Sequence, residues 1–255
     1  MQKPPPSRRE AAPRRIGGTL LLAAALSLTT LPARADPFLN MAENSAMMGR
    51  SVAAQMGMAA VSKSYYPQDG RPPGPRTQPK IAALRIGSDR AISREVRQRF
   101  RDGLVRANPG AEAAIDRALA KDWLQGYRTD IAVPNGLDAR NLADVYAGYM
   151  IANWAIVHQR DTIAPQAIAA VRRTMAAQLG AGGAAAAMTG AERQRAGETM
   201  IYQTTLIMAN REALAREGNA QRRQQAAEHY RRVFRQDSGV DLARLDLTDR
   251  GFVQR

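Results

Sequence analysis

One stretch near the middle of the chain constrains the fold more than any other. Between residues 141 and 158 the only strongly polar residues are Asn141, Asp144, Asn153 and His158. A helix that is apolar most of the way round is buried on all sides. The sequence therefore predicts a helix over residues 137–160 at the centre of a helical bundle.

The rest of residues 88–255 is also patterned for helices. Apolar residues recur at helical spacing, and capping and breaking residues separate the segments. Ser88 is the expected cap of the first helix, and Thr189 with Glu192 has the spacing of a capping box. No segment alternates convincingly like a strand. We expect an all-α bundle of about six helices, over residues 88–107, 110–125, 137–160, 165–179, 189–218 and 219–236.

The C-terminal stretch "GVDLARLDLTDRGF" covers residues 239–252. Thr248 is placed to cap a final helical turn that ends at Gly251. Phe252 is then free to pack into the bundle. We expect this tail to be structural.

The first 35 residues have the pattern of a secretory signal peptide. Basic residues precede a 13-residue apolar run from Thr19 to Leu31, and Ala33-Arg34-Ala35 follows it as an A-x-A cleavage site. The run is too short for a transmembrane helix, which needs about 20 apolar residues. We expect cleavage after Ala35 and a periplasmic or secreted product without a transmembrane helix. A buried helix of the fold and an uncleaved anchor are the alternatives.

Two segments separate this signal from the predicted bundle. Residues 36–62 form a methionine-rich amphipathic segment, with Met41, Met48 and Met56 on one helical face. Methionine adapts to irregular surfaces, so this segment is a candidate docking element. It would cover the bundle itself, a second copy or another protein. Residues 63–87 are rich in proline and predict a linker before a helical domain at 88–255.

Composition excludes several chemistries. The chain has no cysteine, so disulfides, thiol catalysis, thiolate metal sites and iron–sulfur clusters are excluded. Its formal charge is +14; residues 1–35 carry six basic residues and one acidic residue, so the remainder keeps +9. A GC-rich genome, which favours arginine and alanine codons, is one explanation, and affinity for anionic surfaces is the other.

Four arginines form one stripe on the predicted helix 88–107. Arg90, Arg94, Arg97 and Arg101 stand at i, i+4, i+7 and i+11. Near an anionic membrane each basic residue contributes about 1 kcal/mol, so four give roughly a millimolar affinity. The stripe is either a weak adsorption surface or a solvated helix face. No basic–aromatic interleaving is present, so nucleic acid is not an expected partner.

Candidate catalytic groups are sparse. His158 and His229 are the only histidines, and we expect neither a metal site nor a cofactor. Two carboxylate pairs, Glu112/Asp116 and Glu192/Glu198, stand on charge-rich helices where a solvated face is the simpler interpretation. The sequence therefore identifies no catalytic residue.

One polar residue is expected inside the bundle. Asn153 lies on the inner stripe of the predicted helix 137–160, between Tyr149 and Ile156. A buried amide without a hydrogen bond costs a few kcal/mol, at roughly 1–3. We therefore expect Asn153 to make a hydrogen bond between helices.

Two stretches resemble a known family. "NLADVYAGYMIANW" (residues 141–154) and "GVDLARLDLTDRGF" (residues 239–252) are similar to an exported bacterial helical family known as domain of unknown function 6683. The resemblance covers about residues 85–255 and implies an exported helical domain from a bacterium. It implies no activity and no site residues.

Two functions are consistent with these features. The first is an exported, non-enzymatic interaction protein whose partner is another protein or a second copy. The alternative is a carboxylate-dependent hydrolase that acts on an envelope polymer such as peptidoglycan. A buried carboxylate pair with perturbed pKa values, lining a cleft, would favour the hydrolase.

The signal peptide gives the first testable prediction. The intact mass of the protein recovered from the periplasm or the medium should correspond to a chain that begins at Asp36, because the A-x-A site ends at Ala35. Recovery only from membranes, with residue 1 still attached, would contradict it.

Overall fold

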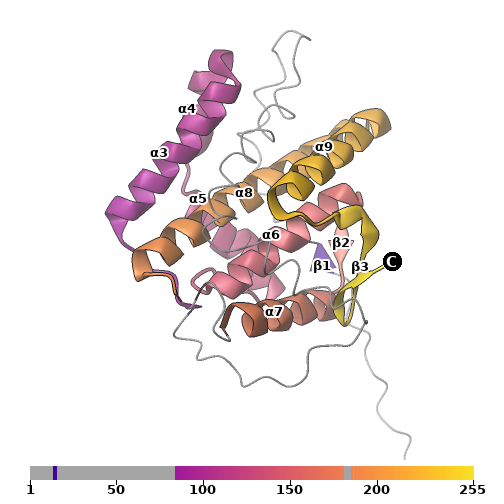
Figure 1. The fold of residues 1–255 in the computed structure, drawn as a ribbon. Coiled ribbons are helices and arrows are strands. Elements are labelled where there is room, and N and C mark those ends of the chain that lie inside the picture. The colour runs from indigo at the N-terminus through magenta and orange to yellow at the C-terminus, as the bar shows by residue number, and fades with distance from the viewer. Residues whose placement is uncertain (1–13, 16–83, 181–184, 186) are drawn as a thin grey trace, which may run out of the picture.

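The computed structural model describes residues 14–15, 84–180, 185 and 187–255, and their fold is predominantly α-helical (Figure 1). Seven α-helices occur in these ranges: α3 (Arg90–Ala107), α4 (Glu112–Leu119), α5 (Trp123–Gly126), α6 (Leu142–Val157), α7 (Pro165–Gly180), α8 (Gly190–Glu217) and α9 (Ala220–Ser238). Four short strands pair in twos: β1 (Arg14–Arg15) with β2 (Thr162–Ile163), and β3 (Leu245–Thr248) with β4 (Gly251–Gln254). No helix in the described ranges is long and apolar enough to cross a membrane.

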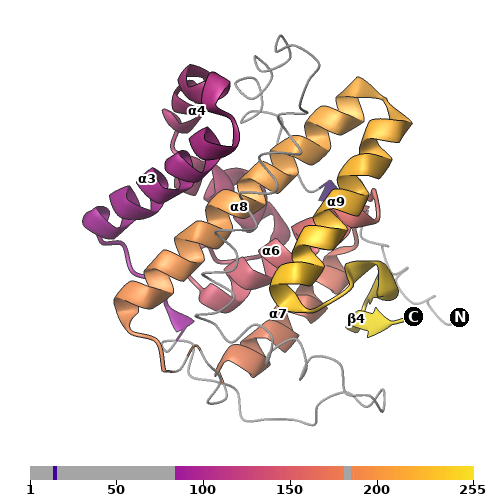
Figure 2. The same cartoon turned by 45° about the horizontal axis from the view of Figure 1, so that its top comes forward.

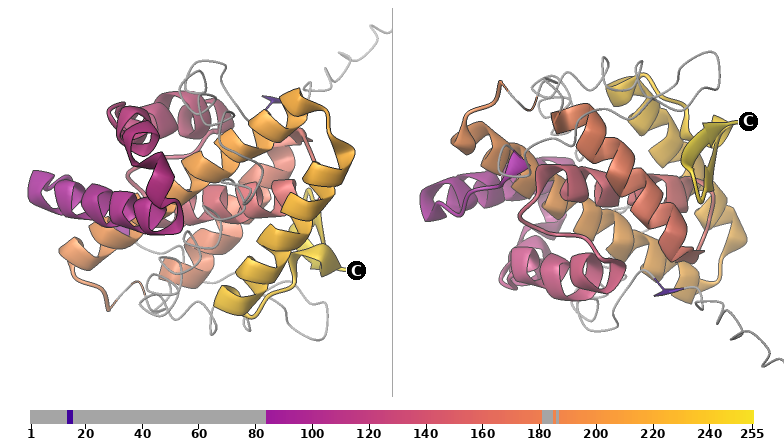
Figure 3. Two further views of the ribbon diagram at one scale, coloured as in Figure 1. Left: turned by 90° about the horizontal axis from the view of Figure 1, so that it is seen from above. Right: turned by 90° about the horizontal axis from the view of Figure 1, so that it is seen from below.

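Helix α6 is the centre of the bundle, as the apolar stretch predicts. Every residue from Leu142 to Ile156 is buried. Helices α7, α8 and α9 all pack against α6. The view from below shows α7 crossing over α6 (Figure 3). Since α6 contacts neighbours on all sides, no face of this helix requires polar residues.

Helices α3 and α4 form an outer layer on the far side of α8 from α6 (Figure 2). Their apolar residues belong to a second hydrophobic cluster, separate from the cluster around α6. Three aromatic rings lie at its centre, with the Phe100 centroid 5.9 Å from Trp123 and 5.0 Å from Tyr202. Because Tyr202 belongs to α8, this cluster attaches the outer layer to the bundle.

Several helix boundaries differ from the prediction. The first helix is capped by Asp89, not Ser88, because the Asp89 carboxylate accepts hydrogen bonds from the amides of Ala91 and Ile92. The predicted helix 110–125 is divided into α4 and α5, and a π-helix follows over residues 127–132. The capping box of Thr189 and Glu192 is present as predicted.

The C-terminal tail is a β-hairpin, and the predicted helical turn is wrong. Thr248 and Gly251 pair at the turn, where the Thr248 hydroxyl donates to the Gly251 carbonyl at 3.1 Å and accepts from the Arg250 amide. Gly251 has φ 98°, a conformation that favours glycine and suits a tight hairpin turn. Phe252 is buried, as predicted, with its ring centroid 6.4 Å from that of Trp154.

The packed domain begins before residue 88. Leu84 and Ile86, at the end of the predicted linker 63–87, are 2% and 4% exposed. The Ile86 amide donates to the Arg140 carbonyl at 2.8 Å, and Arg85 forms a β-bridge with Asn141. The prolines of the predicted linker end at Pro79, so nothing in residues 84–87 prevents this extended segment from pairing and packing with the domain.

The remaining N-terminal predictions lie outside the described residues. These are the signal peptide 1–35 apart from Arg14–Arg15, the methionine-rich segment 36–62 with Met41, Met48 and Met56, and the linker up to residue 83.

A close contact between Gly148 of α6 and Tyr127 gives a stability prediction. A Cβ atom at Gly148 would lie 2.7 Å from the Tyr127 hydroxyl oxygen and 3.8 Å from its Cζ. The hydroxyl is buried and has no hydrogen-bond partner among the described residues. Gly148→Ala should lower the free energy of unfolding by about 1–2 kcal/mol through overpacking. Tyr127→Phe should raise it by about 1 kcal/mol, since an unpaired buried hydroxyl is removed.

The double variant tests the cause. In the Tyr127→Phe background the oxygen is gone, so Gly148→Ala should stabilise by up to about 1 kcal/mol through helix propensity. Urea unfolding of the four proteins measures both effects. Equal destabilisation by Gly148→Ala in both backgrounds would exclude the hydroxyl as the obstacle.

Candidate functional site

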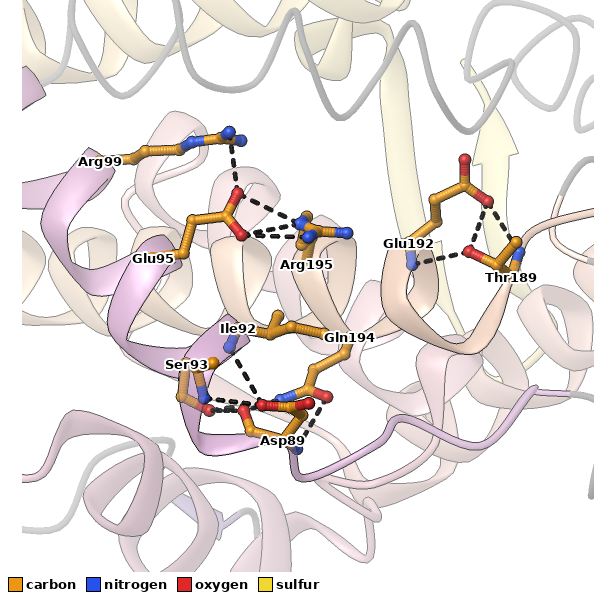
Figure 4. Close-up of polar contacts among 10 residues, drawn as sticks. Asp89, Ile92, Ser93, Glu95, Arg99, Thr189, Glu192, Gln194 and Arg195 are labelled. Atoms are coloured by element: carbon orange, nitrogen blue, oxygen red, sulfur yellow. Dashed lines mark hydrogen bonds and ion pairs between the residues drawn. The ribbon is translucent and has the colours of Figure 1, made fainter.

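The main polar feature of the described chain is a cluster between the start of α3 and the first turns of α8. We call Asp89, Ser93, Gln194 and Glu198 the polar cluster. Gln194 is its hub: its amide nitrogen donates to the Asp89 carbonyl at 2.8 Å and to Glu198 Oε1 at 2.9 Å, and its Oε1 accepts from the Asp89 amide at 3.0 Å. Figure 4 shows Gln194 reaching from α8 to the chain that enters α3. The cluster thus joins the start of α3 to the first turns of α8.

Glu198 is a buried carboxyl group that accepts hydrogen bonds from two neutral donors of the described structure. It is 4% exposed, and its Oε1 accepts from Ser93 Oγ at 2.8 Å and from the Gln194 amide. Its Oε2 is buried and has no hydrogen-bond partner in the described structure. Burial raises the pKa of Glu198 above its ordinary value, and the bonds from Ser93 and Gln194 oppose this shift in part.

Ion pairs surround the cluster on its outer side. Arg195 of α8 binds both carboxylate oxygens of Glu95 on α3, at 3.0–3.2 Å (Figure 4). Arg99 is a second partner of Glu95 at 2.8 Å. The hydrogen bond from Arg195 is the main cause that lowers the pKa of the Glu95 carboxyl. This second link between α3 and α8 is partly exposed, so it contributes little stability by itself.

The predicted arginine stripe is divided by the structure. Arg90, Arg94 and Arg97 are exposed, and none forms an ion pair with a described residue. Arg101 is instead half-buried and lies 2.6 Å from Glu112 and 2.5 Å from Asp116. Its hydrogen bond is the main cause that lowers the pKa of Asp116. Three members of the stripe therefore face solvent, and the fourth holds α4 against α3.

The predicted carboxylate pairs do not form two-carboxylate sites. Glu112 and Asp116 meet, but they bind Arg101 between them. Glu192 belongs to the capping box of α8, whereas Glu198 is buried against α3. The expectation that Glu198 lies on a solvated face is wrong, because its side of α8 is covered by α3. Among the described residues no group of three or more His, Asp or Glu side chains is placed to hold a metal ion.

Both histidines have structural contacts. The His158 ring stacks on Trp154 with centroids 4.5 Å apart, and its Nε2 lies 2.9 Å from the Leu242 carbonyl oxygen. His229 is 4% exposed, and its Nδ1 lies 3.3 Å from Arg232 Nη2. These contacts join α6 to the C-terminal segment and link neighbouring turns of α9.

Asn153 is buried as expected, at 3% exposure. Its amide nitrogen donates to the Tyr149 carbonyl at 2.9 Å, within α6. The predicted bond between helices is replaced by this local bond, because a carbonyl four residues earlier lies within reach of the side chain.

A groove adjoins the polar cluster. It has a volume of about 450 Å³ and lies where the chain before α3 passes the start of α8. Arg85, Gly87, Asp89 and Arg140 line it together with the first residues of α8 and Gln194. The cluster therefore forms part of the wall of this groove, which we call the α3–α8 groove.

Comparison with protein families identifies the chain. A family model described as a family of unknown function, DUF6683, matches residues 11–255. The chain belongs to DUF6683. No curated protein and no solved structure matches it.

The two stretches that resemble DUF6683 are in contact with each other in the structure. The Trp154 indole nitrogen in the first stretch donates to the Leu245 carbonyl in the second at 2.9 Å. The Trp154 and Phe252 rings also meet. In this DUF6683 member these stretches therefore build the contact between α6 and the terminal hairpin.

Sequence reasoning missed the polar cluster as a unit. The hydrogen bonds that join its two helices connect residues 101 to 105 positions apart, and no local pattern indicates such pairs. The sequence offered one sign of the cluster, because Gln194 is a polar residue one helical turn before Glu198. In the structure Gln194 is 1% exposed on α8.

The raised pKa of Glu198 gives a prediction about pH. Above this pKa a charged carboxylate must remain buried, so the stability that Glu198 contributes below pH 4.5 is lost as the pH rises through its folded pKa. Glu198→Gln removes this dependence. The variant should therefore gain stability relative to the parent protein as the pH rises from 4.5 to 8, as measured by urea unfolding.

Glu192→Gln is the matched control on the same helix. The Thr189 backbone amide lowers the pKa of Glu192, so its stabilising contribution is present above pH 4.5 and is lost on acidification. This variant should lose stability relative to the parent as the pH rises towards 4.5, and the difference between the two should change little from pH 4.5 to 8. The same slope for both variants would contradict the assignment of Glu198.

Proposed function

We propose that this DUF6683 protein is an exported bacterial protein that acts by binding, not by catalysis, and that the outer face of α3 contacts an anionic surface of the cell envelope. The observation that carries the proposal is the set of three exposed arginines, Arg90, Arg94 and Arg97, on one helix face. We call this set the α3 arginine face. The predicted signal peptide supports export.

The contrast with Arg101 supports this interpretation of the arginine face. Arg101 has the same spacing on α3, but two carboxylates of α4 neutralise it. The acid pair of α4 therefore binds Arg101, and the other three arginines stay exposed, although Arg97 is near enough to Asp116 to contribute to its lowered pKa. Exposed like charges repel one another, and an anionic surface relieves that repulsion.

The positions of the candidate carboxylates support binding over hydrolysis. A two-carboxylate hydrolase needs two acids that face a shared substrate across several ångströms. Glu112 and Asp116 converge on an arginine instead, and Glu192 and Glu198 serve a helix cap and a helix contact. Each of these groups has a structural partner.

A charge-matched pair of variants tests the proposal. Arg90→Gln, Arg94→Gln and Arg97→Gln together should weaken binding to vesicles with anionic lipid by about a hundredfold, at about 1 kcal/mol for each arginine. Binding of the parent protein should also fall steeply between low and high salt. Vesicle co-sedimentation at several salt concentrations measures both effects.

The control removes the same charge elsewhere. Arg173, Arg235 and Arg250 are exposed on α7, α9 and the hairpin turn, and their replacement by glutamine should leave most of the binding intact. Equal loss in both triple variants would show that only net charge matters. Absence of binding by the parent protein would contradict the proposal.

A further inference from the structure

The α3–α8 groove is built from three separate parts of the chain. Arg85 to Asp89 precede α3, Arg140 precedes α6, and Gly190 and Ala191 open α8. These segments meet because Leu84 and Ile86 are anchored in the core. None of the three arginines of the α3 arginine face lines the groove.

The backbone around the groove is held at several points. Gln194 bonds to both the amide and the carbonyl of Asp89, and the Ile86 amide donates to the Arg140 carbonyl. A Cβ atom at Gly87 would lie 2.7 Å from Gln194 Oε1, so the chain passes Gln194 more closely than other residues allow. A ligand in this groove therefore meets a preorganised wall and does not have to order it.

The charges in the groove are not balanced. Arg85 and Arg140 both line it, and neither forms an ion pair with a described residue. The acid beside them, Asp89, is committed to capping α3 through the amides of Ala91 and Ile92. Other arginines of the domain, such as Arg195 and Arg231, bind carboxylates. Among the residues that the structure describes, the side chains of Arg85 and Arg140 thus have no carboxylate partner.

We propose that the α3–α8 groove binds the carboxylate or phosphate group of a small organic molecule, with Arg85 and Arg140 as the contacting residues. Guanidinium groups match the geometry of these oxyanions and form charge-assisted hydrogen bonds with them. A volume of about 450 Å³ exceeds what a bare oxyanion needs and falls in the range of small-molecule sites. Ile92 offers an apolar wall for the body of the ligand.

Amide NMR titration of the ¹⁵N-labelled protein tests this site. Glycerol 3-phosphate and succinate are the probes for the two oxyanion classes, and glycerol and sodium chloride are the controls. At least one oxyanion should give saturable shifts at the Gly87 and Gly190 amides, and the controls should not. If one probe binds about tenfold more tightly than the other, its oxyanion, phosphate or carboxylate, is the one that the groove selects. Equal binding of both probes means that the groove recognises the negative charge itself.

Variants assign the contacts. Arg85→Gln with Arg140→Gln should weaken binding about tenfold or more, since each removes a charge-assisted hydrogen bond. The Arg193 side chain donates to the backbone carbonyl of Arg85, and this bond does not depend on the Arg85 side chain. The fold should therefore persist in the variant, and amide resonances away from the groove check this. The single variants should each give part of the loss.

The triple variant of the α3 arginine face separates this site from the proposed function. This variant should bind the oxyanion probe as tightly as the parent protein does, although its binding to vesicles is lost. The inference is overturned if neither probe gives saturable shifts, or if the Arg85/Arg140 double variant binds as tightly as the parent.

Discussion

Burial of α6 is the constraint on which the rest of the structure depends. A helix that is covered on every side requires partners around its whole circumference, and α7, α8 and α9 supply them. The terminal hairpin covers the end of α6 at Trp154, whose indole nitrogen bonds to a hairpin carbonyl. Small residues help this arrangement: Gly148 leaves room for the Tyr127 hydroxyl, which a Cβ atom at this position would approach to 2.7 Å. The outer layer of α3 and α4 is then added through α8.

The joint between this outer layer and the bundle combines apolar and polar contacts. Phe100 and Tyr202 bury aromatic surface at one end, and the polar cluster lies at the other. A buried carboxyl group in such a joint is costly when charged, so the protonation state of Glu198 and the docking of α3 are coupled. The α3–α8 groove lies beside this joint, and its walls share Asp89 and Gln194 with the cluster. Binding in the groove would therefore be sensitive to the position of α3.

Local patterns predicted much of the fold. The apolar stretch placed α6 at the centre, and the capping box placed the start of α8. The hairpin was missed because its strands have only four residues each, and in β3 one buried residue is followed by three half-buried ones. Such a strand gives little alternation between apolar and polar residues. The candidate site was less predictable. The spacing on α3 put four arginines in one stripe, but only the structure shows that Arg101 is neutralised by residues of another helix. Contacts between distant segments leave no periodic signal.

The long sequence separation within the polar cluster has a consequence for biosynthesis. Asp89 and Gln194 are 105 residues apart. At about 5–20 residues per second, the ribosome needs roughly 5–20 seconds to reach α8 after α3 has been made. During this interval only α4 and α5 are present to pack against the apolar stripe of α3. The part of that stripe that packs on Tyr202 and Leu206 of α8 stays uncovered. The outer layer therefore cannot complete its hydrophobic cluster until α8 has been synthesised, so the first half of the domain cannot reach its final packing on its own.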